Sequence, residues 1–251
     1  GSAMFRRLGV PMADSRPVQV RVNSTNLMAT VGSTSFGSYA ANEQYNEDFV
    51  QRSWPTDPAG NSYRGIRGPT NDGPQPEADL SWQGADFFAT GSYTNAYFKQ
   101  NNFLPNDYTD LIRLIGVLNL QGGYANAANY VDKVREVLDV EEWMRYLAIN
   151  TLLDNNETCL ANGVGDDYAL YRGTNDTRFL VLPYDLDTVL ARGLTTTSPG
   201  HSIWRMNDLP VMDRFMKTPA FAPRYFYWLK TLADTAFAPA QLNPVLDQLL
   251  Q

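Results

Sequence analysis

The chain has 251 residues, a net charge of −7 at pH 7, 43% hydrophobic residues and 12% aromatic residues, which is enough for a real core and too apolar for a disordered chain. One cysteine and one histidine exclude an internal disulfide and a cysteine-based zinc cluster, and they disfavour a His-rich metal site. No apolar run approaches the roughly 18 residues of a membrane helix, and an acidic charge without a basic face disfavours nucleic acid as a partner.

The front of the chain predicts mainly strands. Residues 3–9 are typical of the end of an amphipathic helix. Residues 17–23 alternate Val with Gln and Arg, which predicts a half-buried strand. A turn at 23–26 leads to a second expected strand within 27–44, so we expect a hairpin here. A short helix is expected over 46–54.

The middle of the chain changes from loop to helix. Residues 55–92 are dense in Pro, Gly, Asn and Asp, which predicts a loop with one short strand. Apolar residues then recur at helical spacing over 111–119 and 140–153, which predicts two helices. Asp139 is expected to cap the second helix, with Glu142 completing an arrangement like a capping box.

A hairpin interrupts the helical part of the chain. A strand is expected at 168–173, a turn at 174–176 and a partner strand at 178–185. The tail from Leu209 onward predicts two or three amphipathic helices. The expected order is therefore a β-rich front, a loop-rich middle and a helical body with one hairpin.

Acidic residues bracket this hairpin. Asp166 and Asp167 precede its first strand, and Asp185 and Asp187 follow its second strand, where residues two apart face the same way. The polar loop at 154–157 is expected to reach the same place. Carboxylates that converge in this way repel each other unless a divalent cation such as Mg²⁺ or Mn²⁺ neutralises them.

The alternative interpretation of these acids is structural. An Asp after a strand is a common turn or helix-capping residue, and a single D-x-D pattern does not separate the two roles. Asp185, however, follows a run of five apolar residues, so we expect it to be partly shielded. Shielded acids usually have a partner, which favours the metal site.

The motifs combine into a recognisable pattern. A long helix is followed by an N-x-acid loop, then YALYR, a short turn and FLVLPYDLD. Further motifs along the chain are GSAMFRRLGVPMADSRPVQVRVN, FGSYAANEQYNEDFVQR, NSYRG and DYTDLIRLIGVLN. Together, over nearly the whole chain, they resemble the spore-coat protein H (CotH) kinase family.

The resemblance implies an α+β fold. It would be a single divergent, protein-kinase-like domain over 1–251, mainly the helical C-lobe with a partial N-terminal β-sheet lobe. Residues 1–92 would form the β-rich and loop-rich part, and 93–251 the helical part with the metal-site hairpin at 167–187. The family's phosphate-contacting basic residue would lie before residue 1, so we expect an N-terminally incomplete domain.

The resemblance also implies roles for the acids. Asp185 would be the metal-binding acid that corresponds to the Asp of a kinase DFG motif, and Asp187 would face the same metal. Asp167 stands where the family has a second metal-side residue, an Asn. Glu157 stands where the family has its catalytic Asp, and Asp154 would be its substitute. The longer acid at 157 and the added charge at 167 leave the activity open.

The nucleotide side is expected to involve other residues. Tyr184 replaces the Trp often found before the metal Asp and would help to stack an adenine ring. Glu43, in the matching G-x-Y-x-x-x-E segment, would either pair with a missing basic residue or stand as an exposed strand-end acid. Lys99 and the other lysines are expected on helices or loops, so none qualifies as the phosphate contact. Arg64 and Arg67 would either contact phosphate or the substrate or belong to a solvated loop, and the loop is favoured.

The resemblance implies a metal-dependent protein kinase that transfers phosphate from ATP to Ser or Thr of a protein substrate, with Mg²⁺ or Mn²⁺. One alternative is a catalytically impaired pseudokinase that acts as a surface protein-binding or adhesive module. Another is transfer of a different group from the same nucleotide. An extracytoplasmic or cell-surface location and the absence of a membrane span are expected in each case.

Overall fold

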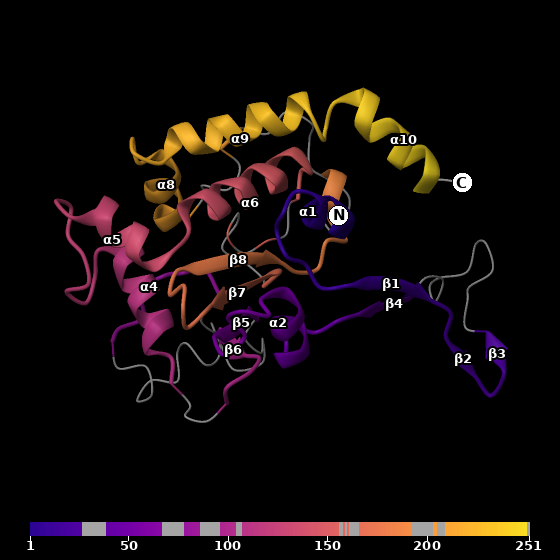
Figure 1. Ribbon diagram of the computed structural model, residues 1–251, viewed down its shortest axis with the longest axis horizontal. Helices are drawn as coiled ribbons and strands as arrows, with labels where there is room; N and C mark the ends of the chain where they lie inside the picture. The colour runs from indigo at the N-terminus through magenta and orange to yellow at the C-terminus, as the bar shows by residue number, and fades with distance from the viewer. Residues whose placement is uncertain are drawn as a thin grey trace.

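A four-stranded antiparallel sheet lies at the centre of the structure, with helices on both sides (Figure 1). The computed structural model describes residues 1–26, 39–66, 78–85, 96–103, 107–155, 158, 160, 166–191, 203–204 and 209–249. The sheet has the strand order β6 (Tyr97–Lys99), β5 (Asn61–Gly65), β7 (Tyr168–Arg172) and β8 (Phe179–Pro183). This mixture of helices and antiparallel strands confirms the predicted α+β class.

The hairpin predicted at 168–185 is confirmed. β7 pairs with β8, and Tyr168 stands opposite Pro183 at one end of the ladder. The pairing continues past this end, because the Tyr184 N–H donates to the Asp167 carbonyl oxygen at 3.3 Å. The entry and the exit of the hairpin therefore lie at the same end of the sheet.

The larger core lies on one side of the sheet. α6 (Val140–Leu152) packs against β8, and α9 (Ala222–Asp234) packs on α6 (Figure 1). α6 begins where the sequence predicts, since the Asp139 side chain accepts the Glu142 backbone N–H at 3.0 Å. The other helices are α1 (Ser2–Arg7), α4 (Thr109–Asn119), α5 (Tyr130–Val137), α8 (Pro210–Lys217) and α10 (Pro239–Leu249).

A smaller apolar cluster covers the opposite face. α2 (Glu47–Ser53) confirms the short helix expected at 46–54, and the Asn46 side chain caps it by accepting the Phe49 N–H at 3.2 Å. Phe49 belongs to a buried cluster with Ala169 of β7 and Leu182 of β8, which stand opposite each other in the sheet and point to the same face. The sheet is thus apolar on both faces, which explains why its strands are almost entirely buried.

Two strand pairs form a ribbon that extends away from this sheet (Figure 1). β1 (Ser15–Val18) pairs with β4 (Tyr39–Asn42), and β2 (Arg21–Val22) pairs with β3 (Thr25–Asn26) through the predicted turn. The strand predicted at 17–23 is present in part, as the end of β1 and as β2, but its predicted burial was wrong: β1 is exposed along its length because it belongs to a separate two-stranded sheet. Residues 27–38 of the expected second strand lie outside the described residues.

Two side chains differ from the prediction. The Glu142 carboxyl does not complete a capping box; it accepts the Val181 N–H of β8 at 3.0 Å, because this edge amide is buried and needs an acceptor. Lys99 is not on a helix or loop. It ends β6, is buried, and its ammonium donates to the Asp107 carbonyl oxygen at 3.0 Å.

The sheet joins the two parts expected within the domain. β5 comes from the expected loop-rich part at 1–92, and its neighbours β6 and β7 come from 93–251. Much of the expected loop, at 67–77 and 86–92, lies outside the described residues. In the described part of the chain, no helix is both long and apolar enough to cross a membrane.

Candidate functional site

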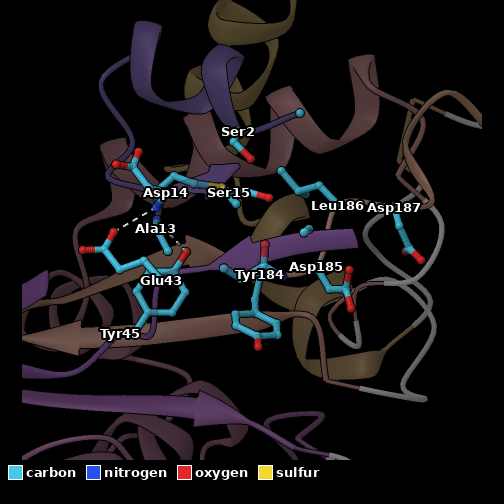
Figure 2. A pocket seen from close by; sticks show the side chains of 14 residues that line it. Ser2, Ala13, Asp14, Ser15, Glu43, Tyr45, Tyr184, Asp185, Leu186 and Asp187 are labelled. Atoms are coloured by element: carbon cyan, nitrogen blue, oxygen red, sulfur yellow. Dashed lines mark hydrogen bonds between the residues drawn. The ribbon is translucent and has the colours of Figure 1, made fainter. Parts of the chain in front are cut away.

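A pocket of about 240 Å³ lies where β8 ends. Most of its lining comes from residues 12–15 at the start of β1, from residues 40–45 in and after β4, and from residues 184–187 after β8. Figure 2 shows Asp14 and Glu43 on one side of the pocket and Asp185 and Asp187 on the other. The ribbon and the hairpin exit therefore supply opposite walls.

Asp185 stands in the wall formed by the hairpin exit. Partial burial of its carboxyl, followed by the nearby carboxylates of Asp187 and Asp166, raises the pKa of Asp185 above its ordinary value. The Arg64 guanidinium acts in the opposite direction. Two carboxylates and one cation therefore act on Asp185 in this wall of the pocket.

Asp154, Asp167 and Asp185 share an unusual backbone conformation. Their φ angles are 47°, 24° and 41°, all in the left-handed region. This conformation is uncommon for residues other than Gly and is concentrated at functional sites. Asp167 is only 6% exposed. Burial, and then the charges of Glu142 and Asp167, raise the pKa of Tyr146 on α6, so Asp167 lies close enough to this helix to act on it.

Hydrogen bonds connect the loop after α6 to the segment after β8. The Asn155 side-chain amide donates to the Asn150 side-chain oxygen at 2.9 Å, and the Thr188 hydroxyl donates to Asn155 Oδ1 at 2.8 Å. The predicted approach of this loop to the hairpin exit is therefore seen at its start, next to Asp154. Glu157 lies outside the described residues, so its place at the site stays a prediction.

Arg64 is a residue for which the sequence interpretation favoured the wrong setting. It lies on β5, not in a solvated loop, and its guanidinium carbon lies 3.8 Å from the centre of the Tyr184 ring. Its Nη2 is 3.4 Å from Asp166 Oδ2, and its buried Nε–H has no hydrogen-bond partner among the described residues. The available signal was NSYRG itself, in which Tyr63 and Arg64 face opposite sides of a strand.

Glu43 has a basic partner close by in the chain. Arg52 Nη2 lies 2.7 Å from Glu43 Oε2, and the same oxygen accepts the Asp14 N–H at 2.9 Å (Figure 2). Asp14 also pairs with Arg6 and Arg16. Glu43 therefore neither lacks a basic partner nor stands alone. It joins a network of ion pairs at the pocket rim, and its contact with a nucleotide stays a prediction.

The comparison with protein families shows which family the chain belongs to. A family model described as CotH kinase protein matches residues 2–251. The chain belongs to the CotH kinase family. This confirms the resemblance drawn from the motifs and indicates a kinase-like protein. No curated protein matches the chain.

The CotH family implies a divalent metal, and the chemistry of the hairpin exit fits one. In phosphate-transfer sites Mg²⁺ is commonly bound by one or two carboxylates and completes its shell with water and phosphate oxygens. Asp185 and Asp187 offer such a pair, since the charge of one raises the pKa of the other. Within the described residues, no three His, Cys, Asp or Glu side chains are grouped to hold a metal. Asp167 is therefore not grouped with Asp185 and Asp187 at one metal, whereas the place of Glu157, outside the described residues, stays a prediction.

Proposed function

We propose that this CotH protein is a metal-dependent atypical protein kinase that transfers phosphate from ATP to Ser or Thr side chains of a protein. The observation that carries the proposal is the group of charges after β8, where Asp187 and the Arg64 guanidinium, which lies over the Tyr184 ring, both act on Asp185 in the wall of the pocket. Phosphoryl transfer needs mainly positioning and electrostatic stabilisation of the phosphates. Carboxylates for a metal and a cation for phosphate meet this need.

Asp185 and Asp187 would hold Mg²⁺ or Mn²⁺, and water and phosphate oxygens would complete its shell. When bound, the metal would neutralise charge on the phosphate oxygens. Ligation also favours ionised carboxylates, so it would offset the burial and the repulsion that raise the pKa of Asp185.

Arg64 would supply the phosphate contact for which no lysine qualifies. A guanidinium presents several N–H donors in one plane and binds phosphate oxygens in pairs. The Arg64 side chain is 32% exposed, so a phosphate oxygen would meet the N–H groups at the end of its guanidinium and not the buried Nε–H. Since Arg64 covers one face of the Tyr184 ring, an adenine would stack on the other face.

Asp154 or Glu157 would orient the attacking hydroxyl of the protein substrate. This role requires an accurately placed carboxylate, because the hydroxyl must lie about 3 Å from both the carboxylate and the phosphorus. The hydrogen bonds of Asn155 with Asn150 and Thr188 support this requirement, since they fix the start of the loop against the segment that follows β8.

The test is transfer of labelled phosphate. We expect the protein, given ATP labelled in the γ-phosphate and Mg²⁺ or Mn²⁺, to label itself or casein offered as an acceptor. Asp185→Asn should reduce the rate by at least about a hundredfold, because it removes stabilisation of the developing charge. Asp132→Asn, a change to a side chain that is 81% exposed, should leave the rate unchanged.

Three other outcomes of the labelling and binding experiments would each change the assignment. Labelling that is unchanged in Asp185→Asn would reject the assigned metal site and the kinase mechanism built on it. Release of AMP instead of ADP would show transfer of a different group. Calorimetry that finds no binding of ATP in the presence of Mg²⁺ would instead support a pseudokinase that binds proteins.

A further inference from the structure

Glu142 is a buried acid that the proposed reaction does not use. It lies in the first turn of α6 and is 5% exposed. Its neighbour Glu141 faces the other way, toward α9, where it pairs with Arg224 at 2.6 Å and accepts the Trp228 indole N–H at 2.9 Å. The two adjacent acids therefore have opposite environments, one in the core and one on the surface.

Glu142 occupies the position that a further strand would take beside β8. β8 is an edge strand, so alternate backbone groups point away from β7. The Phe179 carbonyl oxygen accepts both the Asp139 N–H at 3.1 Å and the Trp143 indole N–H at 2.9 Å. Two residues further on, the Val181 N–H donates to Glu142 Oε2 at 3.0 Å. The first turn of α6 thus closes this edge.

The same edge leads directly to the site. The next outward-facing residue is Pro183, which has no N–H to satisfy, and its carbonyl oxygen accepts the Tyr45 hydroxyl. Tyr184 and Asp185 follow at once. The bond between Glu142 and Val181 therefore holds the last part of β8 before the residues that line the pocket.

The environment of Glu142 favours its uncharged form. The pKa of Glu142 is raised to about 8, mainly by burial and also by the Asp139 carboxylate, although the Val181 N–H and the Arg145 guanidinium act to lower it. The Tyr146 hydroxyl is also coupled to this carboxyl. Arg178, which lies outside α6, acts on Glu142 indirectly, because it forms an ion pair with Asp139 at 3.1 Å. The second oxygen, Oε1, is buried without a hydrogen-bond partner among the described residues.

We propose that Glu142 is a positioning residue, a protonated carboxyl that completes the edge of β8 and thereby holds Tyr184 and Asp185 at the pocket. Ionisation would place a charge in the core with one oxygen unpaired, and separation of α6 from β8 would relieve this cost. The folded-state pKa lies above the unfolded value. The stability that Glu142 contributes is therefore complete below about pH 4 and is lost as the pH rises through about 8.

The test compares Glu142→Gln with Glu141→Gln by amide hydrogen exchange. Gln keeps an oxygen acceptor for the Val181 N–H and does not titrate. Between pH 7 and pH 9 we expect the protection factor of the Val181 amide to fall about tenfold in the wild type, because its carboxyl ionises over this range. The fall should be absent in Glu142→Gln and retained in Glu141→Gln.

Two further measurements complete the test. Tryptophan fluorescence should change near pH 8 in the wild type and not in Glu142→Gln, since the Trp143 indole binds the same strand edge. Affinity for ATP with Mg²⁺ should weaken over the same range in the wild type and in Glu141→Gln, and not in Glu142→Gln. A Val181 protection factor that falls equally in Glu142→Gln would overturn the inference.

The effect of Glu142 on nucleotide binding rests on the proposed kinase function, but its role at the edge of β8 and the kinase proposal can fail separately. Hydrogen exchange and fluorescence need no nucleotide, so they decide the role of Glu142 at the edge of β8 by themselves. If the protein binds no ATP at any pH while the Val181 result holds, the kinase proposal fails and the role of Glu142 in ordering β8 stands.

Discussion

Arg64 and Asp185 show how one cation adjusts the charge of an acidic corner. Burial and two neighbouring carboxylates oppose ionisation of Asp185, and Arg64 favours it. Arg64 is itself held by the Tyr184 ring, 3.8 Å from its guanidinium carbon, and by Asp166. The cation is therefore fixed at the point where it compensates negative charge, whether that charge comes from the protein or from a phosphate.

Replacement of Arg64 tests this interpretation. Arg64→Gln should weaken binding of ATP with Mg²⁺ by about ten- to a hundredfold, as expected for loss of hydrogen bonds to a charged group. The affinity of Arg64→Lys should lie between those of the wild type and Arg64→Gln, because lysine keeps the charge and loses the planar donors. Isothermal titration calorimetry measures these affinities. Arg113→Gln, which removes a surface pair with Glu136, is the control, and an Arg64→Gln affinity equal to it would contradict the proposed contact.

At the scale of elements, the β7–β8 turn depends on a side chain from elsewhere in the chain. The Asp57 carboxylate accepts the backbone N–H groups of Thr174 and Asn175 at 2.8 and 3.0 Å, and that of Asp176 at 3.1 Å. The Tyr171 hydroxyl donates to the Asp57 carbonyl oxygen. A residue between α2 and β5 thus fixes the turn that joins the two strands leading to the site.

Loss of this carboxylate should destabilise the protein. Asp57→Ala should lower the free energy of unfolding in urea by about 1–3 kcal/mol, because it leaves the turn amides without their acceptor. Burial acts to raise the pKa of Asp57, but the bonds from Asn175, Asp176 and Thr174 lower it on balance.

The effect should therefore depend on pH in a defined direction. A lowered folded-state pKa means that the contribution of Asp57 is present above about pH 4 and is lost as the pH falls through the folded-state value. The difference between wild type and Asp57→Ala should accordingly be full at pH 6 and shrink near pH 2. Asp132→Ala is the exposed control, and a gap that widens on acidification would contradict the assignment.

Local signals in the sequence were sufficient for several of these elements. The alternation in YALYR and FLVLPY and the intervening TND predicted the hairpin, and Asn46 and Asp139 mark the starts of their helices. These features depend on residues a few positions apart. The acids at the two ends of the hairpin were therefore placed correctly at one end of the sheet.

Pairing across the whole molecule was not predictable in this way. β5 pairs with β7, so Arg64 stands opposite Ala169 although more than a hundred residues separate them. Arg64 and Glu142 both have roles that exist only after such distant segments meet. The same holds for β1: its alternating valines indicated a covered strand, but burial depends on which layer the strand joins.

The ribbon of β1 and β4 has a consequence for the molecule as a whole. Two-stranded sheets are marginally stable alone, and this one supplies a wall of the pocket opposite the hairpin exit. A ligand that touches both walls would tie the ribbon to the body and suppress its local opening. Trypsin cleavage after Arg21 should therefore slow about tenfold when ATP and Mg²⁺ are present at about ten times the dissociation constant.

Cleavage after Arg135, on α5 far from the ribbon in the chain, is the internal reference and should proceed at the same rate with or without nucleotide. Equal slowing at both sites, or at neither, would contradict the link between ribbon and pocket. In surroundings rich in proteases, the lifetime of this protein would then depend on the concentration of nucleotide. Molecules without bound nucleotide would be cleaved at the ribbon, and molecules with bound nucleotide would stay intact.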